Sequence, residues 1–167
     1  MTLRTYTKSI LIAALISVSL GGLLLHIRIH PLSNNTANII PLIAGILSVI
    51  VVPVLFSIKK TVQYGYVLNG MMAIIGTVIM THFSIANWPQ QATFVTVIVQ
   101  TMLSDNLILW TNFFIGKAIF DLETFGYDQD KEKKGVTYRY PNMGWWLVHL
   151  IVISAVYTLG HMIWRQI

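Results

Sequence analysis

Five long apolar segments, separated by shorter polar stretches, dominate the pattern of hydrophobic and polar positions along the chain. A membrane-spanning helix needs roughly 20 mostly apolar residues to cross about 30 Å of hydrocarbon. The segments that meet this requirement are residues 9–29, 39–58, 64–85, 92–115 and 145–164. The pattern therefore predicts an all-α fold, a polytopic membrane helical bundle of about five transmembrane helices that forms a single domain over residues 1–167.

The composition supports a lipid environment. Of the 167 residues, 55% are hydrophobic and only 10% are charged, whereas a soluble domain carries roughly 25% charged residues. The chain has no cysteine, which excludes disulfides, thiolate metal sites and cysteine nucleophiles. It also has no phosphate-binding glycine loop and no nucleophile elbow, so a self-contained NTPase or hydrolase is not expected. The sequence leaves open whether the protein is an enzyme.

The distribution of basic residues predicts the orientation of the bundle. Nine of the eleven lysines and arginines fall on one side of the predicted membrane, and only Arg28 and Arg165 fall on the other. The positive-inside rule then places the N-terminus in the cytoplasm and the C-terminus outside, as expected for a prokaryotic cytoplasmic membrane protein. Because these residues flank apolar segments, the formal charge of +5 reflects orientation and not nucleic-acid binding. The nine are Arg4, Lys8, Lys59, Lys60, Lys117, Lys131, Lys133, Lys134 and Arg139.

The connection between the fourth and fifth helices, residues 117–144, is the longest polar stretch and is predicted to be cytoplasmic. It holds five of the six acidic residues among its basic ones. Such a charge run is usually a solvated surface loop, and the alternative is a docking patch for a cytoplasmic partner. A chain of this size with such a loop is typical of a component that assembles with other membrane subunits or as a homo-oligomer.

Four of the five histidines are expected at the non-cytoplasmic end. His26 and His30 lie four residues apart and share one helical face, which Gly22 and Ser19 continue into the membrane. His82 closes the third helix and His161 lies near the end of the fifth. Since the first, third and fifth helices all run outward, we expect His26, His30, His82 and His161 to occupy one layer. His149 is predicted at the cytoplasmic end.

Such a layer predicts a cofactor site. Imidazole ligates transition metals and haem, and it can donate a hydrogen bond to a quinone carbonyl. The candidates are therefore haem b, a transition metal or a quinone, held by these four histidines, and Arg28 could pair with haem propionates. The alternative is that the histidines lie at the interface because they are amphipathic and favour helix C-termini.

Asp105 and Asn106 form the second candidate site, near the middle of the predicted fourth helix. An acid at this depth costs roughly 2.5–3.5 kcal/mol on insertion scales, so its carboxylate should face the bundle or a partner. The functional interpretation is a proton or ion relay, and the alternative is an interhelical hydrogen bond that fixes packing. The third helix carries small and polar residues suited to close packing, namely Asn69, Gly70, Gly76 and Thr77.

Three functions remain compatible with the sequence. The first is a membrane subunit of a redox or metal-dependent assembly that binds haem, metal or quinone through the histidine cluster. The second is a structural or assembly subunit without a cofactor of its own. The third is an ion or proton transport component centred on Asp105.

Overall fold

The computed structural model describes residues 2–29, 39–86, 103–128, 130 and 143–164, and some side chains inside these ranges lie outside the description. The described chain is nearly all helical. In order, its elements are α1 (Leu3–Ile29), α2 (Ile39–Ile46), the π-helical segment η3 (Leu47–Val51), α3 (Val52–Ser57), the 3-10 turn η4 (Lys59–Thr61), α4 (Val62–Ala86), α6 (Leu103–Thr124) and α8 (Met143–Trp164).

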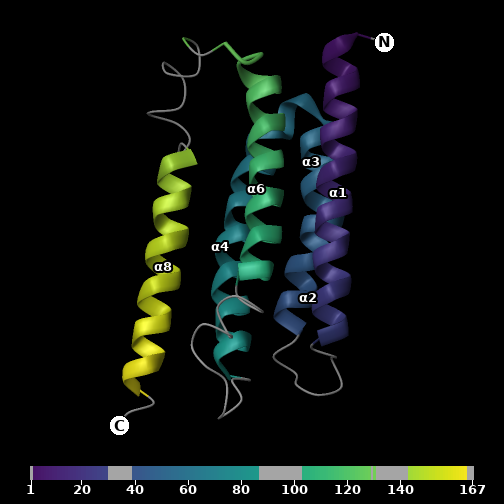
Figure 1. The fold of residues 1–167 in the computed structure, drawn as a ribbon. Coiled ribbons are helices and arrows are strands. Elements are labelled where there is room, and N and C mark those ends of the chain that lie inside the picture. The colour runs from purple at the N-terminus through teal and green to yellow at the C-terminus, as the bar shows by residue number, and fades with distance from the viewer. Residues whose placement is uncertain (1, 30–38, 87–102, 129, 131–142, 165–167) are drawn as a thin grey trace.

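The long helices stand side by side (Figure 1). α1 packs along α6 and beside α2, α6 packs against α4, and α4 packs against α8, which stands on the flank opposite α1. Within the described residues, three helical stretches are long and apolar enough to cross a membrane: Leu3–Arg28, Ile39–Ser57 and Lys59–Ile79. The chain is therefore built as an integral membrane protein, since these stretches expose apolar side chains that require lipid.

The second apolar segment is a continuous helix whose central turn is π-helical. α2, η3 and α3 follow one another without a break, but the hydrogen-bond spacing widens over Leu47–Val51, where the amide of Val52 donates to the Leu47 carbonyl. Pro53 follows immediately and has no amide hydrogen to donate, which perturbs the preceding turn. The Ser48 hydroxyl donates to the Ala44 carbonyl at 2.9 Å, a bond that also bends helices.

α6 extends beyond the expected end of the fourth helix. That helix was predicted to end at Ile115 and the charged connection to begin at residue 117, but α6 continues to Thr124. Lys117 and Asp121 form an ion pair one turn apart, and the Phe120 side chain is fully buried. These contacts stabilise the two extra turns, so the connection begins later than predicted.

Two residues with left-handed backbone conformation follow the end of α6. Gly126 and Tyr127 have φ angles of 62° and 64°, the conformation that commonly terminates helices. The Tyr127 hydroxyl donates to the Ala118 carbonyl at 3.2 Å, which anchors the turn to the helix. Burial, together with the charge of Asp121, raises the pKa of the Tyr127 hydroxyl above its usual value.

α1 begins earlier than expected, at Leu3, because its basic residues have partners in the fold. Glu123 at the end of α6 accepts ion pairs from Arg4 (3.4 Å) and Lys8 (3.3 Å). The Arg4 guanidinium also donates to the Glu123 carbonyl at 3.0 Å, and the Lys8 ammonium donates to the Ser57 carbonyl at 3.2 Å. The starts of α1 and α4 and the ends of α3 and α6 therefore meet at one end of the bundle.

This charged end holds five of the described basic residues, whereas Arg28 lies near the opposite end of α1. α1, α4 and α8 all run from the charged end toward the other (Figure 1), as alternating helix directions require. We call these the charged end and the distal end. The five basic residues are Arg4, Lys8, Lys59, Lys60 and Lys117.

An aromatic core fills the half of the bundle nearest the charged end. Tyr66 stacks on Phe120 with ring centroids 4.4 Å apart, and Trp146 meets the edges of Tyr66 (6.3 Å) and Phe113 (6.1 Å). Trp146 is only 4% exposed. Gly70 explains this burial, because a Cβ there would lie 2.7 Å from the indole ring, so only glycine lets Trp146 pack against α4.

Candidate functional site

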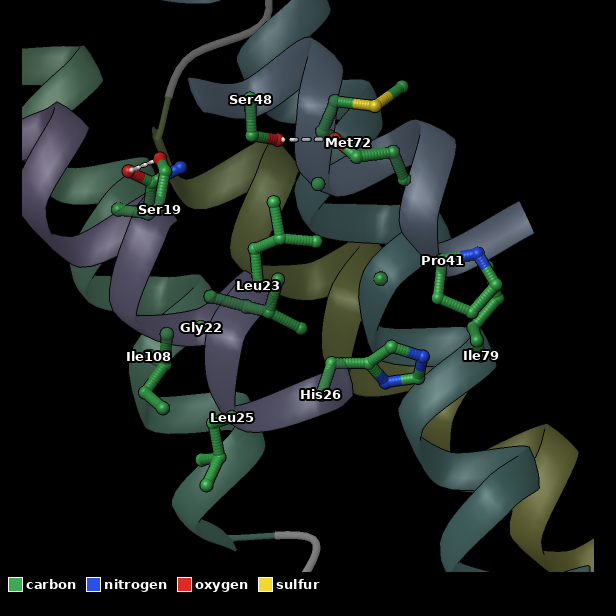
Figure 2. Close-up of a pocket in the computed structure, with 15 residues that line it drawn as sticks. Ser19, Gly22, Leu23, Leu25, His26, Pro41, Ser48, Met72, Ile79 and Ile108 are labelled. Atoms are coloured by element: carbon green, nitrogen blue, oxygen red, sulfur yellow. Dashed lines mark hydrogen bonds between the residues drawn. The ribbon is translucent and has the colours of Figure 1, made fainter. Parts of the chain in front are cut away.

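A cavity lies in the distal half, where small residues replace the aromatic core. It has a volume of about 80 Å³, is partly open and is mostly apolar. α1, α2, η3, α4 and α6 all contribute to its walls, so it lies between the helices that share the bundle core (Figure 2). Its polar lining residues are Ser19, His26, Ser48 and Asn112.

His26 is the titratable residue of this cavity. Its side chain is buried, at 6% exposure, and Figure 2 shows its ring directed toward Pro41 of α2 and Ile79 of α4. Ser19, Gly22 and His26 line the same cavity, so these three residues share one face of α1, and the fold directs that face into the bundle. The seven residues from Ser19 to His26 span about 10 Å along the helix, so these two polar groups stand at opposite ends of the cavity.

A chain of side-chain hydrogen bonds closes the end of the cavity nearest the charged end. The Ser19 hydroxyl donates to Asn112 Oδ1 at 3.0 Å. The Asn112 amide nitrogen donates to Asn69 Oδ1 at 3.2 Å, and the Asn69 amide nitrogen donates to the Asn112 carbonyl at 3.3 Å. The chain joins α1, α6 and α4 inside an apolar bundle, where a satisfied polar group fixes helix register and an unsatisfied one is costly.

Glycines set the dimensions of the site. A Cβ at Gly76 would lie 2.7 Å from Leu109, and a Cβ at Gly22 would lie 3.0 Å from Ile108. Gly116 faces the Asn69 amide so closely that any side chain there would displace it. Close approach of α6 to α1 and α4 therefore depends on these three glycines, and this approach brings Asn112 to the cavity.

No protein-family model, curated protein or solved structure matches this chain. Function is therefore inferred from the site itself.

The other predicted histidines are only partly placed. His82 lies in α4 and His161 in α8, both toward the distal ends of their helices, but their side chains lie outside the description, as does His30 altogether. Among the described side chains there is no group of three or more metal-ligating residues. α8 stands on the flank opposite α1 (Figure 1), so the backbone positions do not by themselves bring His161 to His26. The four-histidine layer remains a prediction.

Arg28, Asn106 and His149 do not line the cavity. Arg28 is exposed on α1. Asp105 lies in the first turn of α6 as described, and its side chain is outside the description. Asn106 is described, and its Oδ1 atom is buried without a hydrogen-bond partner. His149 lies near the charged end as predicted, where its ring stacks on Trp145 at 3.7 Å.

Sequence reasoning missed two parts of the site. It named Asn69 only as a polar residue suited to close packing and did not pair it with Asn112, because the pairing depends on the relative height of α4 and α6. It also did not predict the π-helical segment before Pro53, which carries Ser48 into the cavity wall. The sequence feature that could have indicated the π-helical segment is a serine, Ser48, five residues before Pro53 inside an apolar segment.

Proposed function

We propose that this chain is an integral membrane subunit of a redox assembly, and that it binds a quinone head group in the cavity at His26. The observation that carries the proposal is the buried imidazole of His26, which lies in a mostly apolar cavity with a hydroxyl and an amide at the opposite end. Ligand sites commonly have this composition, an apolar wall with a few convergent polar groups.

The size of the cavity favours a head group over a complete haem. About 80 Å³ is far below the 300–1,000 Å³ or so of pockets that enclose whole drug-sized ligands. A quinone needs to insert only its ring, because its isoprenoid tail can remain in the lipid. Since the cavity is partly open, rotation of the Leu23 or Ile108 side chain would complete the space for the ring.

The hydrogen-bonding groups also suit a quinone. Its two ring carbonyls face opposite directions and span roughly 5 Å, and a hydrogen bond of about 2.8 Å at each end gives a span of roughly 11 Å between donors. Ser19, whose hydroxyl bonds to Asn112, is about 10 Å from His26 along α1, so the distance from His26 to the Asn112 end of the cavity is close to this span. In this arrangement His26 donates to one carbonyl, and the amide nitrogen of Asn112, which has a second hydrogen, donates to the other.

The proposed topology has five spans, with the N-terminus in the cytoplasm and the C-terminus outside, in a prokaryotic cytoplasmic membrane. It is supported by the gathering of basic residues at the charged end and by the positive-inside rule. The cavity then lies in the outer half of the bilayer. Other membrane subunits, or further copies of the chain, would complete the assembly.

The binding test compares two histidines of the same chain. We expect a His26→Leu variant in lipid nanodiscs to bind a short-chain benzoquinone or naphthoquinone about three- to tenfold more weakly, the loss of one hydrogen bond. The matched control is His149→Leu, because His149 lies near the charged end and away from the cavity. Equal affinity of the wild-type and His26→Leu proteins would rule out the quinone site.

The haem and metal forms of the site depend on the predicted convergence of His26 with His30, His82 and His161. An optical spectrum with a Soret band, or stoichiometric metal in the purified protein, would favour them over the quinone form. A protein without quinone, haem or metal would favour the alternative of a structural or assembly subunit, for which the apolar outer face of α8 (Val148, Val152, Val156 and Leu159) offers a surface.

Transport centred on Asp105 is the remaining alternative. It predicts that Asp105→Asn abolishes ion or proton flux in reconstituted vesicles, and unchanged flux would eliminate it.

A further inference from the structure

On α4 and α6, three polar atoms are buried without a hydrogen-bond partner, in addition to the Trp146 indole Nε1 of α8. They are Thr77 Oγ1, Asn106 Oδ1 and Trp110 Nε1. Thr77 is 1% exposed. A buried polar atom left unpaired costs free energy, and in a bilayer no bulk water is available to satisfy it. Three such atoms in one region therefore call for a common explanation.

Contacts nearer the charged end place these residues at one level. Trp146 of α8 packs against Gly70 of α4 and against Phe113 of α6. Two helical turns toward the distal end, the equivalent positions are Thr77 on α4 and Asn106 on α6, because seven residues return a helix to nearly the same face. Thr77 and Asn106 therefore occupy converging faces about 10 Å beyond Trp146.

Trp110 completes the group. It lies four residues after Asn106, so the two side chains are neighbours on the surface of α6. The cavity at His26 is separate, because it lies on the other side of the contact between Gly76 and Leu109.

We propose that Thr77, Asn106 and Trp110 bind water between α4, α6 and α8. The indole N–H can only donate and the amide oxygen can only accept, whereas the threonine hydroxyl can do both. A cation would repel the indole N–H, and an anion would repel the amide oxygen. Water accepts from Trp110, donates to Asn106 and pairs with Thr77, within the two to four hydrogen bonds that buried waters typically make.

Isosteric variants test this inference, because bound water and a dry site predict changes in Tm of opposite sign. With water bound, Thr77→Val and Asn106→Leu each remove one partner of the water and should each lower the Tm by about 2–4 °C. The double variant should lose less than the sum, because the two residues share the same water. In a dry site, each substitution removes an unpaired polar atom and would leave the Tm unchanged or raise it, which would overturn the inference.

Thr111→Val is the matched control. Thr111 lies on α6, as Asn106 does, but it is exposed. The Tm of the Thr111→Val variant should therefore not fall.

A direct measurement on the wild-type protein avoids any dependence on folding of the variants. In lipid bilayers, water-edited solid-state NMR should transfer water magnetisation to the Asn106 side chain faster than to that of Asn69, which is buried and bonded to Asn112. Equal transfer to Asn106 and Asn69 would overturn the inference.

Discussion

At the scale of single residues, glycines have different structural roles at different positions in this bundle. Gly70 and Gly76 lie where a neighbouring side chain takes the place of a Cβ. Gly126 has open space around it but a left-handed φ of 62°. Gly21, on the lipid-facing side of α1, has open space and ordinary helical geometry. The same substitution should therefore change stability in opposite directions at different glycines.

Gly126→Ala should destabilise the protein by about 1–2 kcal/mol, because an alanine in the left-handed region brings its Cβ too close to the backbone. Gly21→Ala is the control and should be neutral or stabilising by about 0.5–1 kcal/mol, since alanine is the better helix former. Denaturant unfolding in detergent measures both. Equal effects of the two substitutions would show that the turn after α6 does not depend on its left-handed conformation.

At the scale of elements, the sequence predicted helices well and their ends poorly. The apolar runs located α1, the α2–α3 segment and α4, because lipid-facing helices must be apolar along their length. The end of α6 was wrong, since Lys117, Asp121 and Glu123 resemble loop residues until their ion-pair partners are known. Those partners lie on α1 and within α6, so only the fold supplies them.

The candidate site was likewise predicted only in part from the sequence. The shared face of Ser19, Gly22 and His26 followed from helical spacing alone, but only the fold shows that this face lines a cavity. The bond between Asn69 and Asn112 did not follow, because spacing within one helix gives no information on the height of its neighbour. The sequence of one helix thus indicates which of its residues share a face, but not which residues of a neighbouring helix they contact.

Packing between α4 and α8 gives a test at this scale. Gly70→Ala should cost about 1–3 kcal/mol, because the new methyl group overlaps the Trp146 indole and forces α8 outward. In a Trp146→Phe background the same substitution should cost clearly less, since the overlapping part of the indole is gone. Unfolding free energies of the four proteins give the coupling. Zero coupling would mean that Gly70 and Trp146 are not in contact.

At the scale of the whole molecule, the bundle is divided along its axis. The half near the charged end is closed by aromatic packing and ion pairs, while the distal half contains the cavity at His26 and the three unpaired polar atoms of α4 and α6. Rigid packing at one end and polar interior space at the other is typical of proteins that place a site on a stable base.

The five-span topology makes a prediction about the two sides of the membrane. Alkaline phosphatase fused after Ile167 should be active, and green fluorescent protein at the same position should be dark, because the C-terminus is predicted to lie outside. Fusions inserted between residues 131 and 142 should give the reverse result. Bright fluorescence from the C-terminal fusion would indicate an even number of spans.

The ion pairs between α1 and Glu123 have a consequence for biosynthesis. Arg4 and Glu123 are 119 residues apart, so at about 5–20 residues per second Glu123 is synthesised roughly 6–24 s after Arg4. During that interval Arg4 and Lys8 have no Glu123 partner while α1 enters the membrane. The ion pairs thus form too late to weaken the charge signal that orients the first helix, and they tie that helix to the bundle only after the direction of insertion is decided.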